Sequence, residues 1–311
     1  MTNTKPNKEE LLQTISVCQG IHDVAQYYNV SYGTIRSWMR WNNINLCPDK
    51  QTLYDDCLHL TDKEIAKKYK VTDKSVNEWK KTYGISKKQI RKEKYPSFFT
   101  NEQDEIITGI LLGDAWLSNP NNHGNLNSHL GVEHGLNQEE YLLDLNKILK
   151  PFSNDVYYKT RNNPFKTAAH HKEKLQCCGF KTAQLEIFTK LRNKWYDRNK
   201  KIVPRDIKLS WRTLAFWFLD DGCNLLGERC VRNHGVFCTN SFSVDDVQIL
   251  INQIRKKNID CSFYFNYNQP IIKLHKSTFC YFIKNISPYI KYECLQYKLQ
   301  LRIESMKGKK N

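Results

Sequence analysis

The sequence predicts an α+β protein in which two αββαββα units follow one another as a pseudo-symmetric tandem repeat, preceded by a small all-α helix-turn-helix region. Three observations lead to this prediction. A helical pattern is duplicated near the N-terminus, two apolar helices further along each end in an aspartate, and the same order of helices and strands follows each of them. We expect five segments: helix-turn-helix repeats at 1–46 and 47–86, a basic linker at 87–97, and the two halves of the tandem repeat at 98–206 and 207–311.

The composition is strongly basic. Lysine and arginine number 48 against 32 aspartate and glutamate, the formal net charge is +16, and the first 95 residues and the rest share the excess. Such a field favours polyanions, above all nucleic acid, because binding releases counterions from phosphates. The polar N-terminus contains no apolar signal segment, and no apolar run approaches the roughly 20 residues of a membrane span. We therefore expect an intracellular protein without a membrane partner, in the cytoplasm or the nucleoid, with an organelle left open.

Two segments of the N-terminal region repeat with a period of 41 residues. The stretch HDVAQYYNVSYGTIRSWMRWNNI (22–44) aligns with KEIAKKYKVTDKSVNEWKKTYGI (63–85), so that aliphatic and aromatic positions coincide. Each copy predicts a helix, a sharp turn at 29–31 or 70–72, and a second helix. This layout is typical of the helix-turn-helix, whose second helix enters the DNA major groove, although a pair of small helical bundles that bind protein has the same pattern. We expect exposed second-helix residues to contact DNA, namely Arg36, Arg40, Lys74, Ser75, Asn77 and Lys81.

A basic stretch, SKKQIRKEKYP (86–96), follows the second repeat. Its run of positive charge predicts an extended or frayed helical linker. We expect this linker to contact phosphates without reading bases. The side chains that would do so are Lys87, Lys88, Arg91 and Lys92.

Two helices of unusual composition lie further along, DEIITGILLGDAWLS (104–118) and LAFWFLDDG (214–222). In the first, Gly109 and Gly113 are about one helical turn apart, and small residues on one face let a second helix approach closely. In the second, Gly222 predicts a left-handed C-cap. We expect the two helices to pack side by side.

Packed in this way, the helices bring Asp114 and Asp221 together at their ends. Two carboxylates in near contact repel each other, and one of them would normally take up a proton. A divalent cation between them removes this repulsion. Ligation by oxygen alone indicates a hard cation, so we expect Mg²⁺, with Mn²⁺ as an alternative.

The same elements follow both helices. After the first, the pattern predicts a strand at 128–134, a helix at 138–149, strands at 156–160 and 174–180, and a helix at 182–196. After the second, it predicts a strand at 235–241, a helix at 244–257, strands at 261–267 and 270–276, and a helix at 279–286. Each half thus reads as αββαββα, in which the first strand is the weakest prediction.

ITGILLGDA (107–115) and LAFWFLDDG resemble the two copies of the motif for which the LAGLIDADG homing endonucleases are named. The two motif aspartates are 107 positions apart, as suits a monomeric member whose halves are pseudo-repeats. Further stretches resemble the intron-encoded monomeric members: NKKIVPRDI (199–207), TNSFS (239–243), and SPYI with CLQYKL (287–299). The resemblance covers about residues 98–303 and implies the family's saddle of antiparallel sheets over DNA.

The resemblance also implies a role for individual residues at the two helix ends. Asp114 and Asp221 match the metal-binding aspartates, and the backbone carbonyls of Gly113 and Asp220 match further metal ligands. The side chain of Asp220 is expected to be solvated or to cap its helix. The sequence departs from the family pattern at three positions, His134, Ala115 and Phe216. None of these departures removes a metal-binding group.

Two lysines match the family's catalytic basic positions, Lys201 in KKIVP and Lys298 in QYKL. A lysine there polarises the attacking water or stabilises charge on the phosphoryl oxygens, and we expect one lysine for each scissile phosphate. Polar residues expected to order solvent around the metals are Glu133, His134, Asn240 and Asn266.

The function that the resemblance implies is site-specific cleavage of double-stranded DNA. Two phosphodiesters would be hydrolysed across the minor groove by a divalent-metal mechanism, leaving short 3′ overhangs, on a long specific target bound by a monomer. The helix-turn-helix modules would add DNA contacts. Two alternatives stay open: a maturase that binds intron RNA, and a catalytically silent DNA-binding regulator. Retention of both aspartates and both lysines favours the nuclease.

Overall fold

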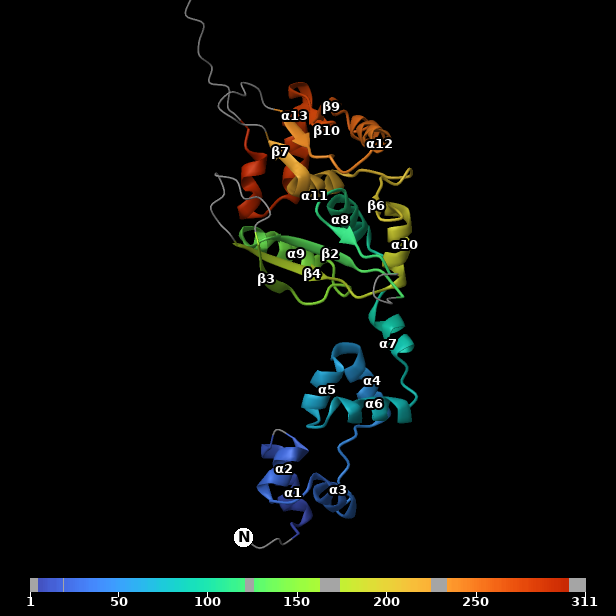
Figure 1. Cartoon of the computed structure of the whole chain (residues 1–311), viewed down its shortest axis with the longest axis vertical. Coiled ribbons are helices and arrows are strands. Elements are labelled where there is room, and N and C mark those ends of the chain that lie inside the picture. Colours follow the sequence, from blue (N-terminus) through green and yellow to red (C-terminus); the bar gives the residue numbers. More distant parts are fainter. Residues whose placement is uncertain (1–4, 19, 121–125, 163–173, 225–233, 302–311) are drawn as a thin grey trace, which may run out of the picture. The chain divides into compact units, whose positions relative to one another are not determined.

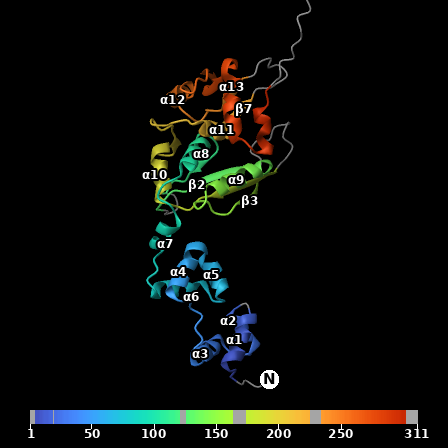
Figure 2. The same cartoon turned by 180° about the vertical axis from the view of Figure 1, so that it is seen from behind.

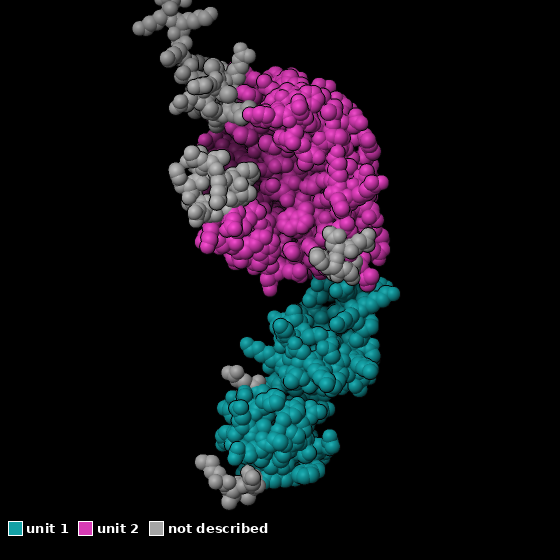
Figure 3. Space-filling model, in the orientation of Figure 1, with its two compact units in different colours: residues 1–97 teal, residues 98–311 magenta. Residues whose placement is uncertain are grey.

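The computed structural model describes residues 5–18, 20–120, 126–162, 174–224 and 234–301 (Figure 1, Figure 2). The chain divides into two compact units, residues 1–97 and 98–311 (Figure 3). In the described part of the chain, no helix is both long enough and apolar enough to cross a membrane.

The first unit contains two three-helix repeats. Their helices are α1 (Lys8–Val17), α2 (Ile21–Tyr27) and α3 (Tyr32–Trp41), then α4 (Lys50–His59), α5 (Asp62–Lys68) and α6 (Asp73–Thr82). The period of 41 recurs in backbone detail, because Asn29 and Lys70 both make the turn with positive φ, at 51° and 55°. Ser31 and Thr72 both cap the second helix through their hydroxyls. The sequence pattern missed α1 and α4, which precede each helix-turn-helix pair.

The cores of the two repeats match at some positions and differ at others. An edge-to-face pair of Tyr28 and Trp38 in the first repeat recurs as Tyr69 and Trp79 in the second. Where the first repeat buries Ile21 and Met39, the second carries Asp62 and Lys80. Those two charges form an ion pair at 2.6 Å, with the lysine buried. The fold of the repeat thus tolerates either an apolar or an ionic contact between its helices.

The basic stretch after the second repeat forms a regular helix, α7 (Lys87–Lys94), capped by the side chain of Ser86. Ile90 packs against the core of the second repeat, and α7 contacts α4. Of the expected extended or frayed helical linker, the helix is present. It is neither extended nor frayed, because Ile90 gives it a surface on which to pack.

The second unit contains the two predicted αββαββα halves, and the predicted order is confirmed. The first half comprises α8 (Asn101–Leu112), β1 (Trp116–Leu117), β2 (Leu130–Gly135), α9 (Glu139–Ile148), β3 (Tyr157–Asn162), β4 (Lys174–Lys181) and α10 (Glu186–Trp195). The second comprises α11 (Trp211–Asp221), β7 (Gly222–Asn224), β8 (Gly235–Phe237), α12 (Val244–Arg255), β9 (Cys261–Asn266), β10 (Gln269–Leu274) and α13 (Lys276–Ile286). Their antiparallel sheets have equivalent orders, β1-β2-β4-β3 and β7-β8-β10-β9.

Helices α8 and α11 pack side by side between the two sheets, as both views show (Figure 1, Figure 2). The contact is close because Gly109 has no side chain. A Cβ there would lie 2.6 Å from the carbonyl oxygen of Thr213 and 2.9 Å from the Cβ of Phe216. The hydroxyl of Thr213 donates to the carbonyl of Glu105 at 3.0 Å, which ties the two helices together. Side-by-side packing was predicted from the glycines and is confirmed.

Gly222 does not form the left-handed C-cap that the sequence suggested. Its φ of −80° and ψ of 142° are extended, and the residue begins β7. The glycine is needed for space instead, since a Cβ would lie 2.1 Å from the ring of Phe218. The chain therefore passes directly from α11 into β7 of the second sheet.

Each half ends in a segment that the other half holds. The hairpin of β5 (Tyr196–Asp197) and β6 (Lys200–Lys201) leads to Val203, whose N–H donates to Asp246 of α12 at 3.2 Å. The 3₁₀ helix η4 (Glu293–Leu299) contacts α9, where the N–H of Glu293 donates to Glu140 at 2.9 Å. These exchanged contacts place the segments that carry the two predicted catalytic lysines.

Candidate active site

The two motif aspartates lie at the joined ends of α8 and α11. The backbone N–H of Asp114 donates to Oδ2 of Asp220 at 3.2 Å, so a direct hydrogen bond joins the helix ends. The side chain of Asp114 is about half exposed, at 49%, whereas that of Asp221 is largely enclosed. Burial and then the charge of Asp114 raise the pKa of Asp221 to about 7, against the opposing charges of the two lysines. A cation bound here would stabilise the ionised form.

Both predicted catalytic lysines lie at these helix ends. Nζ of Lys201 donates to the carbonyls of Gly113 at 3.1 Å and Ala115 at 2.8 Å. Nζ of Lys298 donates to three carbonyls of α11, including that of Asp220 at 3.2 Å. The negative end of a helix dipole favours an ammonium at this position. Desolvation lowers the pKa of both lysines, and the neighbouring aspartates partly oppose that shift.

The side chain of Asp220 is fully buried, so the expectation that it would be solvated or cap its own helix is wrong. Its carboxyl lies in the space that Gly113 leaves, where a Cβ would be 2.4 Å from the Cβ of Asp220. Oδ2 accepts from Asp114, and Oδ1 accepts from the hydroxyl of Tyr141 at 2.9 Å. Burial, followed by the charge of Asp114, holds the pKa of Asp220 well above its usual range. A buried carboxyl group thus links α11 to the other half.

Tyr141 is a site residue that the sequence did not reveal. It lies on α9 and is completely buried beside Tyr292. The one available signal was the doublet of acids at the end of the second motif, because a buried carboxyl requires a hydrogen-bond donor. Nothing in the sequence identified a tyrosine 79 positions earlier as that donor.

His134 lies on β2 between the two helix ends, with 3% of its side chain exposed. Nδ1 is 3.6 Å from Oδ2 of Asp114, and Nε2 is 3.8 Å from Oδ1 of Asp220. The Nε2 atom of His134 is buried and has no hydrogen-bond partner within the described residues. Desolvation lowers the pKa of His134 and favours the neutral ring. Ligand atoms of these three residues lie within 4.8 Å of one another, an arrangement that could hold a metal ion.

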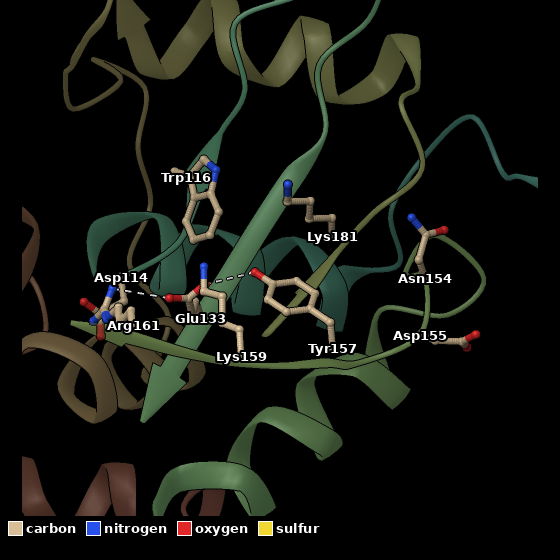
Figure 4. A pocket seen from close by; sticks show the side chains of 9 residues that line it. All are labelled: Asp114, Trp116, Glu133, Asn154, Asp155, Tyr157, Lys159, Arg161 and Lys181. Atoms are coloured by element: carbon tan, nitrogen blue, oxygen red, sulfur yellow. Dashed lines mark hydrogen bonds and ion pairs between the residues drawn. The ribbon is translucent and has the colours of Figure 1, made fainter. Parts of the chain in front are cut away.

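Glu133, expected to order solvent, is engaged by side chains from β3. Its carboxylate accepts from the hydroxyl of Tyr157 at 3.0 Å and pairs with Lys159 at 2.6 Å and Arg161 at 3.3 Å. Burial and this hydrogen bond raise the pKa of Tyr157 to about 12. Figure 4 shows these side chains around a hollow beside Asp114, which is also lined by Trp116 and Lys181. Glu133 therefore holds the basic side chains of Lys159 and Arg161 in place through ion pairs.

Asn240 and Asn266 both lie beside Gln269. Nδ2 of Asn240 donates to Gln269 at 2.8 Å, and Asn266 pairs with that same glutamine across the turn between β9 and β10. Within the part of the chain that the structure describes, neither asparagine hydrogen-bonds to the side chain of Asp221. Their predicted solvent-ordering role stays a prediction.

The predicted DNA-contacting residues of the first unit are exposed, with one exception. Those on the surface are Arg36, Arg40, Lys74, Asn77, Lys81, Lys87, Lys88, Arg91 and Lys92. Ser75 is buried, and its hydroxyl lies 3.1 Å from that of Thr72 at the start of α6. The expectation that Ser75 is exposed is wrong, because this residue faces the N-cap and the repeat's interior.

Two apolar helices that meet at acidic ends between two antiparallel sheets, with a lysine on each helix end, define a class of two-motif nucleases. The sequence model of the LAGLIDADG DNA endonuclease family matches residues 104–282, more than half of the chain, and the chain belongs to this family. The two-motif resemblance noted in the sequence is thereby confirmed.

Individual relatives agree with this assignment. Probable intron-encoded endonuclease 1 of Wickerhamomyces canadensis is 28% identical over 208 residues, which span 65% of this chain and 85% of that protein. Cytochrome b mRNA maturase bI2 of Saccharomyces cerevisiae is also 28% identical over 208 residues, spanning 62% of this chain but 46% of the maturase. The structure of the homing endonuclease I-WcaI bound to its DNA recognition sequence matches with a TM-score of 0.61 and 26% identity, covering 70% of this chain and 95% of that one.

Proposed function

We propose that this protein is a site-specific homing endonuclease that hydrolyses one phosphodiester on each strand of a DNA duplex. The observation that carries the proposal is the meeting of two aspartates and two lysines at the joined ends of α8 and α11. Relatives named as an intron-encoded endonuclease and as a homing endonuclease on its DNA support it. Since one chain supplies an aspartate and a lysine in each half, we propose that it acts as a monomer.

The acidic residues of the site are suited to divalent cations. Asp114 and Asp221 would supply the negative charge. The carbonyls of Gly113 and Asp220, which also accept from Lys201 and Lys298, would be further oxygen ligands. A bound divalent cation lowers the pKa of its water and stabilises the attacking and leaving oxygens of the displacement. Oxygen ligation leads us to propose Mg²⁺, with Mn²⁺ as an alternative. A bound cation would keep the largely buried carboxyl of Asp221 ionised at neutral pH.

The lysines have a separate task. The ammonium group of Lys201 lies on carbonyls just after α8, and that of Lys298 lies on the last carbonyls of α11, both beside the aspartates. From there each would stabilise the charge that develops on one scissile phosphoryl group. The exchanged segments that carry them fix each lysine through contacts with the opposite half. Disturbing one half would therefore affect the lysine of the other.

Two surfaces would bind the duplex. The hollow beside Asp114 presents basic side chains from β3 and β4, which suit phosphates and the base edges of the major groove. In the first unit, the exposed basic residues of α3, α6 and α7 would add contacts, because a helix-turn-helix places its second helix in the groove. Together they suit a long specific target.

A second candidate function is that of a maturase bound to intron RNA. It is favoured by one observation, the 28% identity to a maturase, which equals the identity to the endonuclease. A catalytically silent DNA-binding regulator is the remaining alternative. Retained aspartates and lysines at the helix ends favour the nuclease over both.

Genome-wide end sequencing tests the proposal. Host-type DNA that lacks the protein's own gene is incubated with purified protein and Mg²⁺, beside the Asp221→Asn variant. We expect one or a few sharp double-strand ends with the wild-type protein and none with the variant. DNA that stays intact in Mg²⁺ and in Mn²⁺ despite tight binding would contradict the proposal and direct the search to RNA or to a regulatory site.

A further inference from the structure

The two halves place different residues at equivalent positions beside their motif aspartates. The second residue after each motif aspartate pairs with Gly131 in one half and with Val236 in the other. Three residues further along the chain, His134 and Thr239 take equivalent places. One half therefore presents an imidazole where the other presents a hydroxyl.

The hydroxyl of Thr239 is engaged within its own sheet. Its side chain is completely buried, and its hydroxyl donates to the carbonyl of Pro270 at 2.7 Å. A hydroxyl committed in this way belongs to the sheet. The site around Asp221 is thus left with oxygen ligands from its own helix end.

His134 is uncommitted by comparison. Its Nδ1 lies 3.6 Å from Oδ2 of Asp114, which is too long for a hydrogen bond. Two ligand atoms on one ion, each bonded at about 2.1 Å, are separated by roughly 3.0–3.6 Å. The separation of these two atoms therefore fits a shared cation better than a direct contact.

The other ring nitrogen of His134 faces a suitable partner. A histidine that ligates a metal usually donates its second N–H to a carboxylate or carbonyl, which fixes the ring. Nε2 is buried without a hydrogen-bond partner among the described residues, and the nearest acid is Asp220, whose Oδ1 lies 3.8 Å away. Tyr141 holds that oxygen in place at 2.9 Å. A ligating ring would have its supporting acid already positioned.

We propose that His134 supplies a ring nitrogen to the cation held by Asp114, so that the two sites take different cations. This inference rests on the proposed metal-dependent function. Imidazole suits transition-metal cations, whereas Mg²⁺ prefers oxygen. The site of the first half therefore takes Mn²⁺ or a similar borderline cation in preference to Mg²⁺, and the site of the second half takes Mg²⁺.

Pulsed electron paramagnetic resonance with Mn²⁺ alone tests this, because a coordinated imidazole nitrogen modulates the echo of the ion. Asp221→Asn leaves the first-half site, and Asp114→Asn leaves the second-half site. We expect nitrogen coupling in Asp221→Asn and none in Asp114→Asn. Adding His134→Gln to Asp221→Asn should abolish the coupling and weaken Mn²⁺ binding at least about tenfold. The matched change His129→Gln, at a half-buried histidine of the same region, should do neither.

Labelling histidine with ¹⁵N provides a measurement that leaves His134 unaltered, since the coupling should change to the ¹⁵N pattern. Mn²⁺ bound to Asp221→Asn without any nitrogen coupling would overturn this inference and leave the proposed nuclease intact. Absence of Mn²⁺ binding in both single-aspartate variants and in the wild-type protein would overturn the inference and the proposed function together.

Discussion

The two halves of residues 98–311 share one order of elements and one strand order, yet their helix ends differ. Asp114 is about half exposed and lies beside a histidine, whereas Asp221 is enclosed and its pKa is raised to about 7. Lys201 donates to two carbonyls and Lys298 to three. Repetition of the fold therefore does not make the two sites chemically equal.

The close contact of α8 and α11 explains part of this asymmetry. At two levels of the contact there is room for one side chain only, so Gly109 faces Phe216 and Gly113 faces Asp220. A symmetric pair of side chains at either level would collide, and a symmetric pair of glycines would leave a cavity. The acid that fills the second space is then available to bond the opposite helix end. The close packing therefore lets only the second half place a carboxyl, that of Asp220, between the two helices.

After the loss expected at the motif aspartates, the largest expected effect concerns the lysines. Lys201→Met and Lys298→Met should each lower the cleavage rate about 10²–10³-fold, because each removes a positive charge that stabilises the transition state. We expect the two variants to slow opposite strands, as measured by single-turnover cleavage of a duplex labelled on either strand. Lys200→Met, at an exposed neighbour, is the matched control and should change neither rate. Equal slowing of both strands by either variant would break the assignment of one lysine to each phosphate.

The pH dependence of stability tests the burial of Asp221. In the folded protein the pKa of Asp221 is about 7, above its value of 3.8 when unperturbed, so the folded state binds the proton more tightly. The contribution of Asp221 to the free energy of unfolding of the metal-free protein should therefore be largest near pH 4 and fall towards pH 7, by at most about 1.4 kcal/mol per unit. Urea denaturation in EDTA measures this, and Asp221→Asn should flatten the slope. An unchanged slope in that variant would show that Asp221 does not titrate in this window.

Gly113→Ala tests the packing asymmetry. The added Cβ would lie 2.4 Å from the Cβ of Asp220, so the second unit should lose about 1–3 kcal/mol of unfolding free energy. In Gly33→Ala the new Cβ meets nothing nearer than 3.6 Å, on an exposed face of α3. That control should stabilise the first unit by about 0.5–1 kcal/mol through helix propensity. Thermal unfolding followed by calorimetry measures both, and a neutral Gly113→Ala would contradict the close contact.

The smallest expected effect concerns the first unit. Replacing Arg36 and Arg40 of α3 by alanine should weaken DNA binding and lower the slope of log affinity against log salt by about 2, if each contacts one phosphate. The position of cleavage should not change. Lys190→Ala, which removes an exposed charge from α10, is the control for net charge. Titration of a labelled duplex at several salt concentrations measures the slope, and equal slopes would exclude α3 from the interface.

The order of elements was predictable because apolar periodicity is a local property of helices and strands. The meeting of the two motif helices was predictable from their apolar runs and glycines. The end of the first was not, because the helix stops at Leu112 and residues 116–117 of the expected helix form β1. The burial of Asp220 was not, since it depends on a glycine and a tyrosine that are distant in the chain. Ser75 failed for a similar reason, because the face of a helix that is buried depends on what packs against it.

Glu133 forms its hydrogen bond and ion pairs with three side chains of β3 because of the strand register, which no local pattern reveals. The pairing of Asn266 with Gln269 across the turn between β9 and β10 depends on strand register in the same way. Residue types therefore identified the chemistry of the site, and long-range pairing decided which side chains take part.

The most direct test of the account is single-turnover cleavage of the target duplex by wild-type protein, Asp114→Asn and Asp221→Asn, with binding measured in parallel. The account predicts that all three bind the duplex within a few-fold of one another. It also predicts that only the wild-type protein cuts both strands, while each variant is slowed more than about 1,000-fold because a divalent-cation ligand is lost. Cleavage of both strands at the wild-type rate by either variant would contradict a catalytic centre built on these two helix ends.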